Sequence, residues 1–223
     1  RDGIDRMYGK QEDLIYYISL YNQNYAMPPV PAAAADGIVR GMYCFRRSSL
    51  GVTRGRKAHL FGSGAIMTEV LEAAGLLEGA GIATDVWSVT SYNELSREAL
   101  RVEREQRLGH DGKPWVQALL EDEQGVFVAA SDHMKALPLS IARWVPGPYT
   151  VLGTDGYGLS ESREELRRHF EVSAAYIAHA TAAALAGRRA VTRRELKDLA
   201  ARWGIEPGKP DASLTGPAGY RRD

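Results

Sequence analysis

The sequence predicts an α/β fold, with three α/β/α layers and a mostly parallel sheet. Two observations lead to this prediction. Short runs of β-favouring residues recur along the chain, and stretches with apolar residues three and four positions apart separate most of them. Strands that alternate with helices in this way usually pair in parallel, so the helices are expected on both faces of the sheet.

Five strands are expected after residue 41. Each run is rich in β-branched, aromatic or other apolar residues and is bounded by turn-forming residues. The runs lie at residues 42–45, 58–61, 85–90, 126–130 and 149–152. An earlier run, residues 14–20, is apolar at successive positions and predicts a further strand, buried between helices.

The helices are marked by their starts and by apolar stripes. Three starts carry the S/T-x-x-E capping box, in which the two side chains satisfy free backbone N–H groups: Ser91 with Glu94, Ser162 with Glu165, and Thr192 with Glu195. The helix expected after Gly64 has one apolar stripe, made by Ile66, Val70, Leu71, Ala74 and Leu77, and should end at Gly79 or Gly81. Another helix should begin near Ser173 and close with Gly187 as its C-cap.

A proline-rich stretch after residue 27 is the strongest domain boundary, because Pro28, Pro29 and Pro31 interrupt both helix and sheet. We therefore divide the chain into residues 1–27, a linker with a short helix at 28–41, a main domain at 42–206, and a Pro- and Gly-rich tail at 207–223 that is expected to be disordered. Because residues 1–9 read as a helix already under way, we expect the chain to be part of a longer protein.

The composition disfavours several classes of function. The 28 basic and 28 acidic side chains give a net charge of zero, so no overall field attracts nucleic acid or an anionic membrane. Cys44 is the single cysteine and cannot form an internal disulfide. The chain has no signal-peptide pattern and no apolar run of membrane length. A cytoplasmic protein without nucleic-acid or membrane partners is therefore expected.

The turn Gly62-Ser63-Gly64 raises the possibility of a dinucleotide site, because it stands between an expected strand and helix. The full fingerprint needs a third glycine, but Met67 occupies that position. Asp85, at the start of the next expected strand, is too early to reach a ribose. The favoured interpretation is a structural turn, and nucleotide binding remains the alternative.

Two loops at the carboxyl edge of the expected sheet hold the candidate site residues. Asp132 and His133 follow one strand, and Asp155, Tyr157 and Ser160 follow the next. We expect them to form an interface or the rim of an active site. The chain has no nucleophile elbow and no metal-ligand spacing, so it predicts no catalytic, cofactor-binding or metal-binding residue of its own.

Several longer stretches, in the order in which they occur, resemble one family. They are "YYISLYNQNYAMPPVP", "HLFGSGAIMTEVLEAAGLL", "DVWSVTSYNELSREAL" and "SDHMKALPLSIARWVPGPYTVLGTDGYGLSESREELRRHFEV". From about Arg6 to about Glu206 the chain resembles the C-terminal end of the homodimeric bacterial pyruvate dehydrogenase E1 component. "GTDGYGLSESRE" makes this resemblance specific.

The resemblance implies an enzyme that uses thiamine diphosphate and Mg²⁺ to decarboxylate pyruvate and passes an acetyl unit to the lipoyl group of the dihydrolipoyl acyltransferase (E2) of a multienzyme complex. Residues 1–27 would end the pyrimidine-binding middle domain, and residues 42–206 would form the transketolase-type C-terminal domain. Its implied role is dimerisation with a second E1 subunit and support of the active site rather than catalysis.

The sequence departs from the cofactor motif of that family. The family holds the metal through G-D-G followed by an asparagine, but this chain has no G-D-G, and Asn22, Asn24 and Asn93 all precede Thr154-Asp155-Gly156. The chain alone is therefore expected to be inactive and to bind neither cofactor. Two alternatives stay open: a free-standing assembly or binding module, and a subunit of a split thiamine-dependent 2-oxo acid enzyme. The choice of 2-oxo acid is also open.

Overall fold

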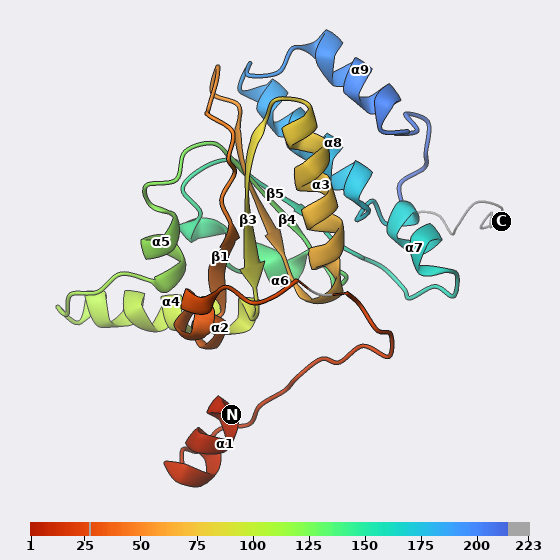
Figure 1. The fold of residues 1–223 in the computed structure, drawn as a ribbon. Helices are drawn as coiled ribbons and strands as arrows, with labels where there is room; N and C mark the ends of the chain where they lie inside the picture. The colour runs from red at the N-terminus through yellow and green to blue at the C-terminus, as the bar shows by residue number, and fades with distance from the viewer. Residues whose placement is uncertain (27, 214–223) are drawn as a thin grey trace.

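The computed structural model describes residues 1–26 and 28–213, and a five-stranded sheet lies at its centre (Figure 1). The strand order is β1-β3-β2-β4-β5. The strands are β1 Met42–Arg46, β2 Lys57–Gly62, β3 Ala83–Val89, β4 Val126–Ala130 and β5 Tyr149–Leu152. β1 pairs antiparallel with β3, and the other neighbouring pairs are parallel. The mostly parallel sheet and the five strands predicted after residue 41 are confirmed.

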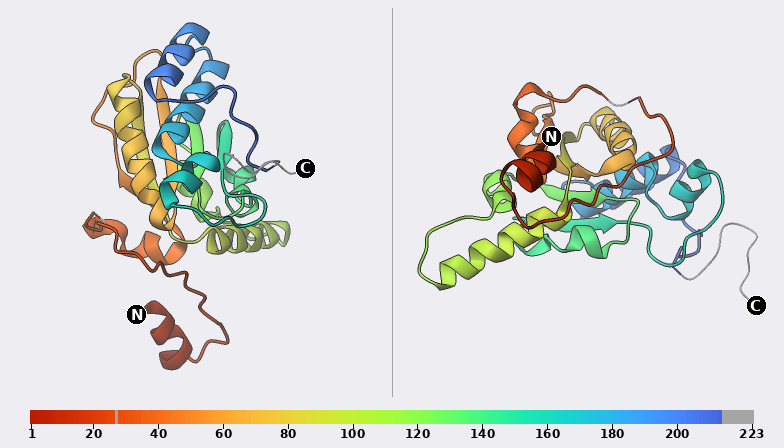
Figure 2. Two further views of the ribbon diagram at one scale, coloured as in Figure 1. Left: turned by 90° about the vertical axis from the view of Figure 1, so that its right-hand side faces the viewer. Right: turned by 90° about the horizontal axis from the view of Figure 1, so that it is seen from below.

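Helices cover both faces of the sheet (Figures 1 and 2). α3 (Met67–Gly79) and α8 (Ala174–Gly187) lie on one face, and α4 (Tyr92–Arg107), α5 (Trp115–Leu120) and α6 (Ala136–Leu139) lie on the other. The chain passes from β2 to β3 through α3, then returns past β2 to β4 through α4 and α5. Because parallel crossovers are right-handed, the two directions of travel place these helices on opposite faces. The three-layer arrangement is confirmed.

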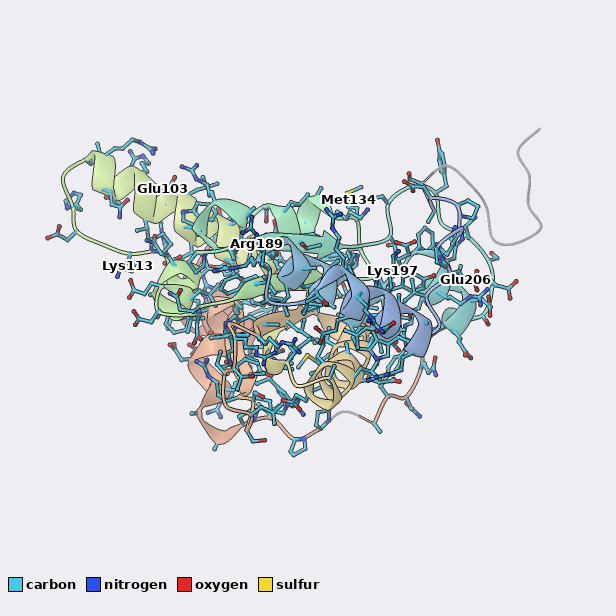
Figure 3. The ribbon with its side chains drawn as sticks, turned by 90° about the horizontal axis from the view of Figure 1, so that it is seen from above. Glu103, Lys113, Met134, Arg189, Lys197 and Glu206 are labelled. Atoms are coloured by element: carbon cyan, nitrogen blue, oxygen red, sulfur yellow. The ribbon has the colours of Figure 1, made fainter. Side chains whose placement is uncertain are left out.

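The remaining elements lie at the ends of these layers. α9 (Arg193–Arg202) packs on α8, and its exposed Lys197 is labelled in Figure 3. The others are α1 Asp2–Ile4, the π-helix η1 Asp5–Gly9, the 3₁₀ turns η2 Ala32–Ala34, η3 Gly64–Ile66 and η4 Ala142–Trp144, and the helices α2 Ala35–Arg40 and α7 Arg163–His169. No helix in residues 1–26 and 28–213 is both long and apolar enough to cross a membrane.

Each face of the sheet has its own hydrophobic core, because successive side chains of a strand point in opposite directions. In the three central strands, Leu60, Val86 and Val128 belong to the core under α3 and α8, and Phe61, Trp87 and Phe127 belong to the core under α4 and α5. All six are at most 1% exposed. Burying side chains of this size contributes about 1.5–3 kcal/mol each, so these two cores dominate the stability of the fold.

The predicted helix starts are confirmed by their hydrogen bonds. The capping hydroxyl accepts from the backbone N–H three residues later at Ser91–Glu94 (3.1 Å), Ser162–Glu165 (3.3 Å) and Thr192–Glu195 (3.1 Å). The predicted C-cap at Gly187 is wrong. Gly187 stays within α8, and the left-handed residue is Arg189, with φ 62°, because the turn closes where Ala190 N donates to Leu185 O at 3.0 Å.

The strand predicted at residues 14–20 is also wrong for the structure described. This segment carries no strand and lies apart from the sheet as an extended connection after α1 and η1 (Figures 1 and 2). Ile15 is 95% exposed, Tyr17 92% and Leu20 86%. A strand requires a neighbouring strand to accept its backbone hydrogen bonds, and the described residues place none beside this segment.

The domain division at residues 27, 41 and 206 stays a prediction. Of the tail expected to be disordered, residues 214–223 lie outside the described residues. In the described part, Lys209 Nζ donates to His169 O at 2.6 Å and to Glu171 Oε1 at 3.1 Å. These bonds fix the chain after α9 against the end of α7.

Candidate functional site

The loops that follow β2, β4 and β5 meet at the carboxyl edge of the sheet. Ser63 Oγ lies 3.4 Å from Ser131 Oγ, which in turn accepts from His133 N at 3.1 Å. Thr154 N donates to His133 O at 3.0 Å, and Thr154 Oγ1 donates to Asp132 O at 2.8 Å. These bonds join the loops after β4 and β5 into one polar network, which we call the carboxyl-edge network.

Asp132 in this network is contacted by a residue far away in the sequence. Tyr21 OH donates to Asp132 Oδ2 at 2.7 Å. Burial, and then this hydrogen bond, raise the pKa of Tyr21 to about 12. Tyr21 therefore remains a neutral hydrogen-bond donor at pH 7 and fixes the segment before the linker against the sheet edge.

The glycine turn at residues 62–64 allows two close approaches. Gly64 has φ 55°, and a Cβ atom there would lie 2.5 Å from Tyr21 OH. A Cβ atom on Gly62 would lie 2.9 Å from Met67 Sδ, at the start of α3. Each glycine therefore occupies a position where a side chain would displace a neighbour, which supports the structural interpretation of the turn.

Replacing Gly64 with alanine should release Tyr21. We expect a loss of about 1–2 kcal/mol in the free energy of unfolding, since an alanine is strained at this φ and the Tyr21 hydrogen bond is lost. Spectrophotometric titration should show the pKa of Tyr21 moving back toward its ordinary value of 10.0.

The control for this variant is Tyr21→Phe, which removes the hydroxyl without straining the backbone. Because both changes delete the same hydrogen bond, their effects on stability should be less than additive in the double variant. Full additivity would show that Gly64 does not make room for Tyr21.

Of the other predicted site residues, Asp155 joins the carboxyl-edge network, whereas the side chains of His133, Tyr157 and Ser160 are exposed to solvent. Asp155 Oδ1 accepts from Lys135 N at 2.8 Å and its Oδ2 lies 3.4 Å from Lys135 Nζ, so it braces the two loops. His133 is exposed, and its Nε2 lies 4.0 Å from Asp132 Oδ1, too far for a catalytic hydrogen bond. Tyr157 is 84% exposed, and Ser160 is exposed. The arrangement can position loops and contact another surface, but it aligns no nucleophile with a base.

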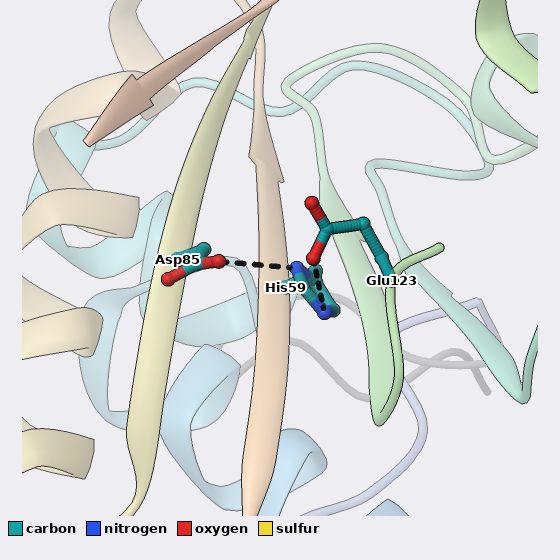
Figure 4. Close-up of side chains that lie close together, drawn as sticks. All are labelled: His59, Asp85 and Glu123. Atoms are coloured by element: carbon teal, nitrogen blue, oxygen red, sulfur yellow. Dashed lines mark ion pairs between the residues drawn. The ribbon is translucent and has the colours of Figure 1, made fainter. Parts of the chain in front are cut away.

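A second polar cluster lies at the amino edge of the sheet (Figure 4). His59 on β2, Asp85 on β3 and Glu123 before β4 bring their ligand atoms within 4.8 Å of one another. Asp85 Oδ1 lies 2.6 Å from Lys57 Nζ and accepts from Ser48 N at 2.8 Å. We call the group made by His59, Asp85, Glu123, Lys57 and Arg47 the amino-edge cluster.

The charges in the amino-edge cluster compensate one another. Arg47 Nη1 pairs with Asp85 Oδ2 at 2.8 Å and with Glu123 Oε1 at 2.5 Å. Burial alone would raise the pKa of Asp85, but hydrogen bonds from Lys57, Ser48 N and Arg47 outweigh it and hold the pKa below its ordinary value. Asp85 is therefore an ionised carboxylate with only 1% of its surface exposed.

His59 is neutral in this environment. Burial lowers its pKa, and this outweighs the attraction of Glu123 and Asp85 for its charged form. Trp87 Nε1 donates to His59 Nδ1 at 3.3 Å, and the Nε2 atom lies 3.1 Å from Gln124 O. These partners fit the tautomer with the proton on Nε2.

The amino-edge cluster does not fit the Mg²⁺ of a thiamine enzyme. Mg²⁺ requires oxygen ligands and several waters, whereas both Asp85 oxygens already face positive side chains and the His59 nitrogens already have partners. Ligands of open α/β sheets also bind at the opposite, carboxyl edge. We interpret this cluster as a structural ion network.

The sequence pattern does not reveal the amino-edge cluster. His59 and Asp85 are directly opposite each other only because of the register between β2 and β3. The sequence did contain a signal for this cluster, because His59 and Asp85 are polar residues at the same position, the third, of two consecutive strands. That signal becomes specific only once the strands are known to be neighbours.

The stability of the chain should fall as the pH drops from 7 to 5. Burial lowers the pKa values of both His59 and His179, so the unfolded chain takes up protons near pH 6.5 while the folded chain does not. Each histidine contributes a slope of at most about 1.4 kcal/mol per pH unit. His59→Gln should flatten the curve of unfolding free energy against pH more than His179→Gln, because His59 is fully buried. Equal slopes in both variants and the unmodified chain, measured by urea denaturation, would contradict this.

The comparison with protein families decides where the chain belongs. Residues 41–173, which include the whole sheet and the carboxyl-edge loops, match the model of the transketolase-like C-terminal domain. The chain belongs to this family. Its fold supports the assignment: a transketolase mutant from Pichia stipitis superposes with a TM-score of 0.50 over 76% of this chain and 21% of that one, at 16% identity.

Within the transketolase-like C-terminal domain family, this chain is homologous to pyruvate dehydrogenase E1 components. It is 41% identical to the one from Pseudomonas aeruginosa over 214 residues, and 40% identical to the one from Escherichia coli K12 over 220 residues. These alignments cover 94% and 96% of this chain. The chain spans about a quarter of the length of these relatives, 24% in both cases.

Proposed function

We propose that the chain is the C-terminal part of a pyruvate dehydrogenase E1 component and supports dimerisation and the active site rather than performing catalysis. The observation that carries this proposal is the identity of about 40% to such enzymes over 94–96% of the chain. In this proposal residues 1–27 end the preceding pyrimidine-binding domain. Residues 28–41 link it to the C-terminal domain at 42–206.

The proposed enzyme converts pyruvate oxidatively and transfers the acetyl group to the lipoyl group of the E2 acyltransferase. Its thiamine diphosphate and Mg²⁺ would be held by other parts of the E1 chain and supply the decarboxylation chemistry. The residues of this chain would position the neighbouring domain, chiefly through Tyr21 and the carboxyl-edge network. The proposed location is the cytoplasm.

A chimera tests this proposal. The segment of the Escherichia coli E1 component that aligns with residues 6–206 would be replaced by those residues of this chain. Pyruvate-dependent acetyl transfer would then be measured with purified E2. We expect a dimeric chimera with thiamine-dependent activity, whereas the E. coli enzyme truncated at the same boundary should lose it. A folded, dimeric chimera that is as inactive as the truncation would refute the proposal.

A more specific role is proposed for five candidate residues: Asp132, His133, Asp155, Tyr157 and Ser160. We propose that their loops form an interface or the rim of the active site in the full enzyme, since they lie at the carboxyl edge with Tyr157 projecting into solvent. In the active chimera, Asp155→Ala with Tyr157→Ala should change kcat/KM or the dimer dissociation constant at least about fivefold, about 1 kcal/mol. Unchanged values of both would remove this role.

The mass of the protein made by its own organism separates this proposal from a free-standing assembly module or split-enzyme subunit. A three-domain E1 subunit should be on the order of 100 kDa, because this 24.5 kDa chain spans about a quarter of the length of its relatives. A mass near 24.5 kDa would favour the alternatives.

A further inference from the structure

A cavity of about 290 Å³ opens beside the carboxyl-edge network, between residues 21–25, the loop after β5 and α7. Apolar walls come from Leu159, Leu166 and Phe170, and an aromatic wall comes from Tyr25. We call it the α7 cavity. Cavities of about 150 Å³ already accommodate a benzene ring, so this volume is enough for a ring with a short substituent.

Two arginines line the α7 cavity, and only one of them pairs with a carboxylate. Arg167 Nη1 pairs with Glu69 Oε1 at 2.7 Å, so its charge is compensated. Arg163 donates from Nη2 to Asn22 Oδ1 at 3.0 Å and from Nη1 to Tyr25 OH, and both acceptors are neutral. Among the described residues, no carboxylate lies within ion-pair distance of Arg163. A guanidinium has five N–H donors, so Arg163 retains donors for an anion.

The aromatic ring of Tyr25 has neighbours on several sides. The guanidinium groups of Arg163 and Arg167 lie 5.5 and 5.8 Å from the centre of the Tyr25 ring, and Tyr21 contacts the same ring edge-on at 6.1 Å. Tyr21 is itself fixed by Asp132. A preformed aromatic surface beside an uncompensated guanidinium offers both parts of a recognition site, because little conformational freedom is lost on binding.

We propose that the α7 cavity binds a small monocarboxylate with an aromatic or branched aliphatic body. The carboxylate pairs with Arg163, and the body packs against Tyr25, Leu159 and Leu166. Paired N–H donors of one guanidinium match the two oxygens of a carboxylate, which favours a carboxylate over a neutral group. Asp132 and Tyr157, which belong to the proposed interface or active-site rim, also line the cavity, and the Asp132 carboxylate accepts a hydrogen bond from Tyr21 at 2.7 Å. The proposed monocarboxylate pairs with Arg163, and its binding does not require the pyruvate chemistry proposed above.

Isothermal titration calorimetry of the 223-residue chain with phenylacetate tests the proposal. We expect saturable binding with a dissociation constant on the order of 1 mM, as befits a ligand of this size. Acetate lacks the body and phenylacetamide lacks the charge, so each should bind at least about tenfold more weakly. Equal binding of all three, or no saturable binding of phenylacetate, would overturn the proposal.

Two variants locate the binding. Arg163→Gln should weaken phenylacetate at least about tenfold, but it also alters the contact with Tyr25. Gly158→Trp therefore provides a second test: Gly158 lines the cavity, a Cβ atom there meets nothing within 4 Å, and the indole should fill the space while Arg163 is kept. Gly51→Trp, also in open space but outside the lining, is the matched control and should bind as the unmodified chain does. Undiminished binding by a folded Gly158→Trp variant would place phenylacetate elsewhere and refute the site.

Discussion

Replacing Asp85 with alanine should lower the free energy of unfolding by about 3–5 kcal/mol at pH 7, the range for breaking a buried ion pair by removing one partner. Asp85 is 1% exposed, and its carboxylate faces Lys57 Nζ, Ser48 N and Arg47 Nη1 at 2.6–2.8 Å. Its loss leaves the Lys57 ammonium, with 16% of its side chain exposed, without this counter-ion. Urea denaturation followed by tryptophan fluorescence would measure the change.

The matched control for this variant is Asp36→Ala. Asp36 lies 3.7 Å from Arg40 with 74% of its side chain exposed, so its ion pair contributes at most about 1 kcal/mol. The contribution of Asp85 to the free energy of unfolding should also depend on pH. Because its folded pKa lies below the ordinary 3.8, its stabilisation is present above that pH and is lost as the pH falls through the folded value. A loss below about 1 kcal/mol at pH 7 would show that the ion pairs of Asp85 do not stabilise the fold as a buried network should.

Replacing Gly125 with alanine should lower the free energy of unfolding by about 2–5 kcal/mol, because backbone strain and steric overlap add. Gly125 has φ 133°, and a Cβ atom there would lie 2.4 Å from Lys57 O and 2.9 Å from Lys57 C. These are backbone atoms at the start of β2, so they cannot move aside as a flexible side chain does. The substitution should also disturb the pairing of β2 with β4, which begins at Ala58 and Val126.

Gly75→Ala serves as the control for Gly125→Ala. Gly75 lies within α3, is exposed, and has open space around its Cβ position. Alanine there should raise the free energy of unfolding by about 0.5–1 kcal/mol, since it favours the helix. Thermal and urea denaturation of both variants should therefore shift in opposite directions. A Gly125→Ala variant as stable as the unmodified chain would contradict the close approach of the two backbones.

Much of the sheet was predictable because its signals are local. β4 and β5 begin and end where their β-favouring runs do, and Ser91, Ser162 and Thr192 mark helix starts through bonds to residues only three positions away. Residues 14–20 carry an equally strong strand signal. The prediction failed there because pairing depends on a neighbour, which a local pattern does not reveal.

The site was predictable to a smaller extent for the same reason. The position of Asp132 and Asp155 at the carboxyl edge follows from the strand pattern, and the structure brings both into one network. The contact of Tyr21 with Asp132 spans 111 positions and was not expected. The role of these residues at an interface or active-site rim stays a prediction.

The late position of α8 in the sequence affects how the chain emerges from the ribosome. Ile177, Ala178 and Leu185 of α8 complete the core that begins with β2 and α3. Until residues 174–187 have been synthesised, the apolar surface of α3 and β4 has no cover from this helix, although the sheet strands are already made. A nascent chain at this stage exposes surface that attracts chaperones or other nascent chains. Synthesis of α8 therefore ends the interval in which this face of the sheet lacks its cover.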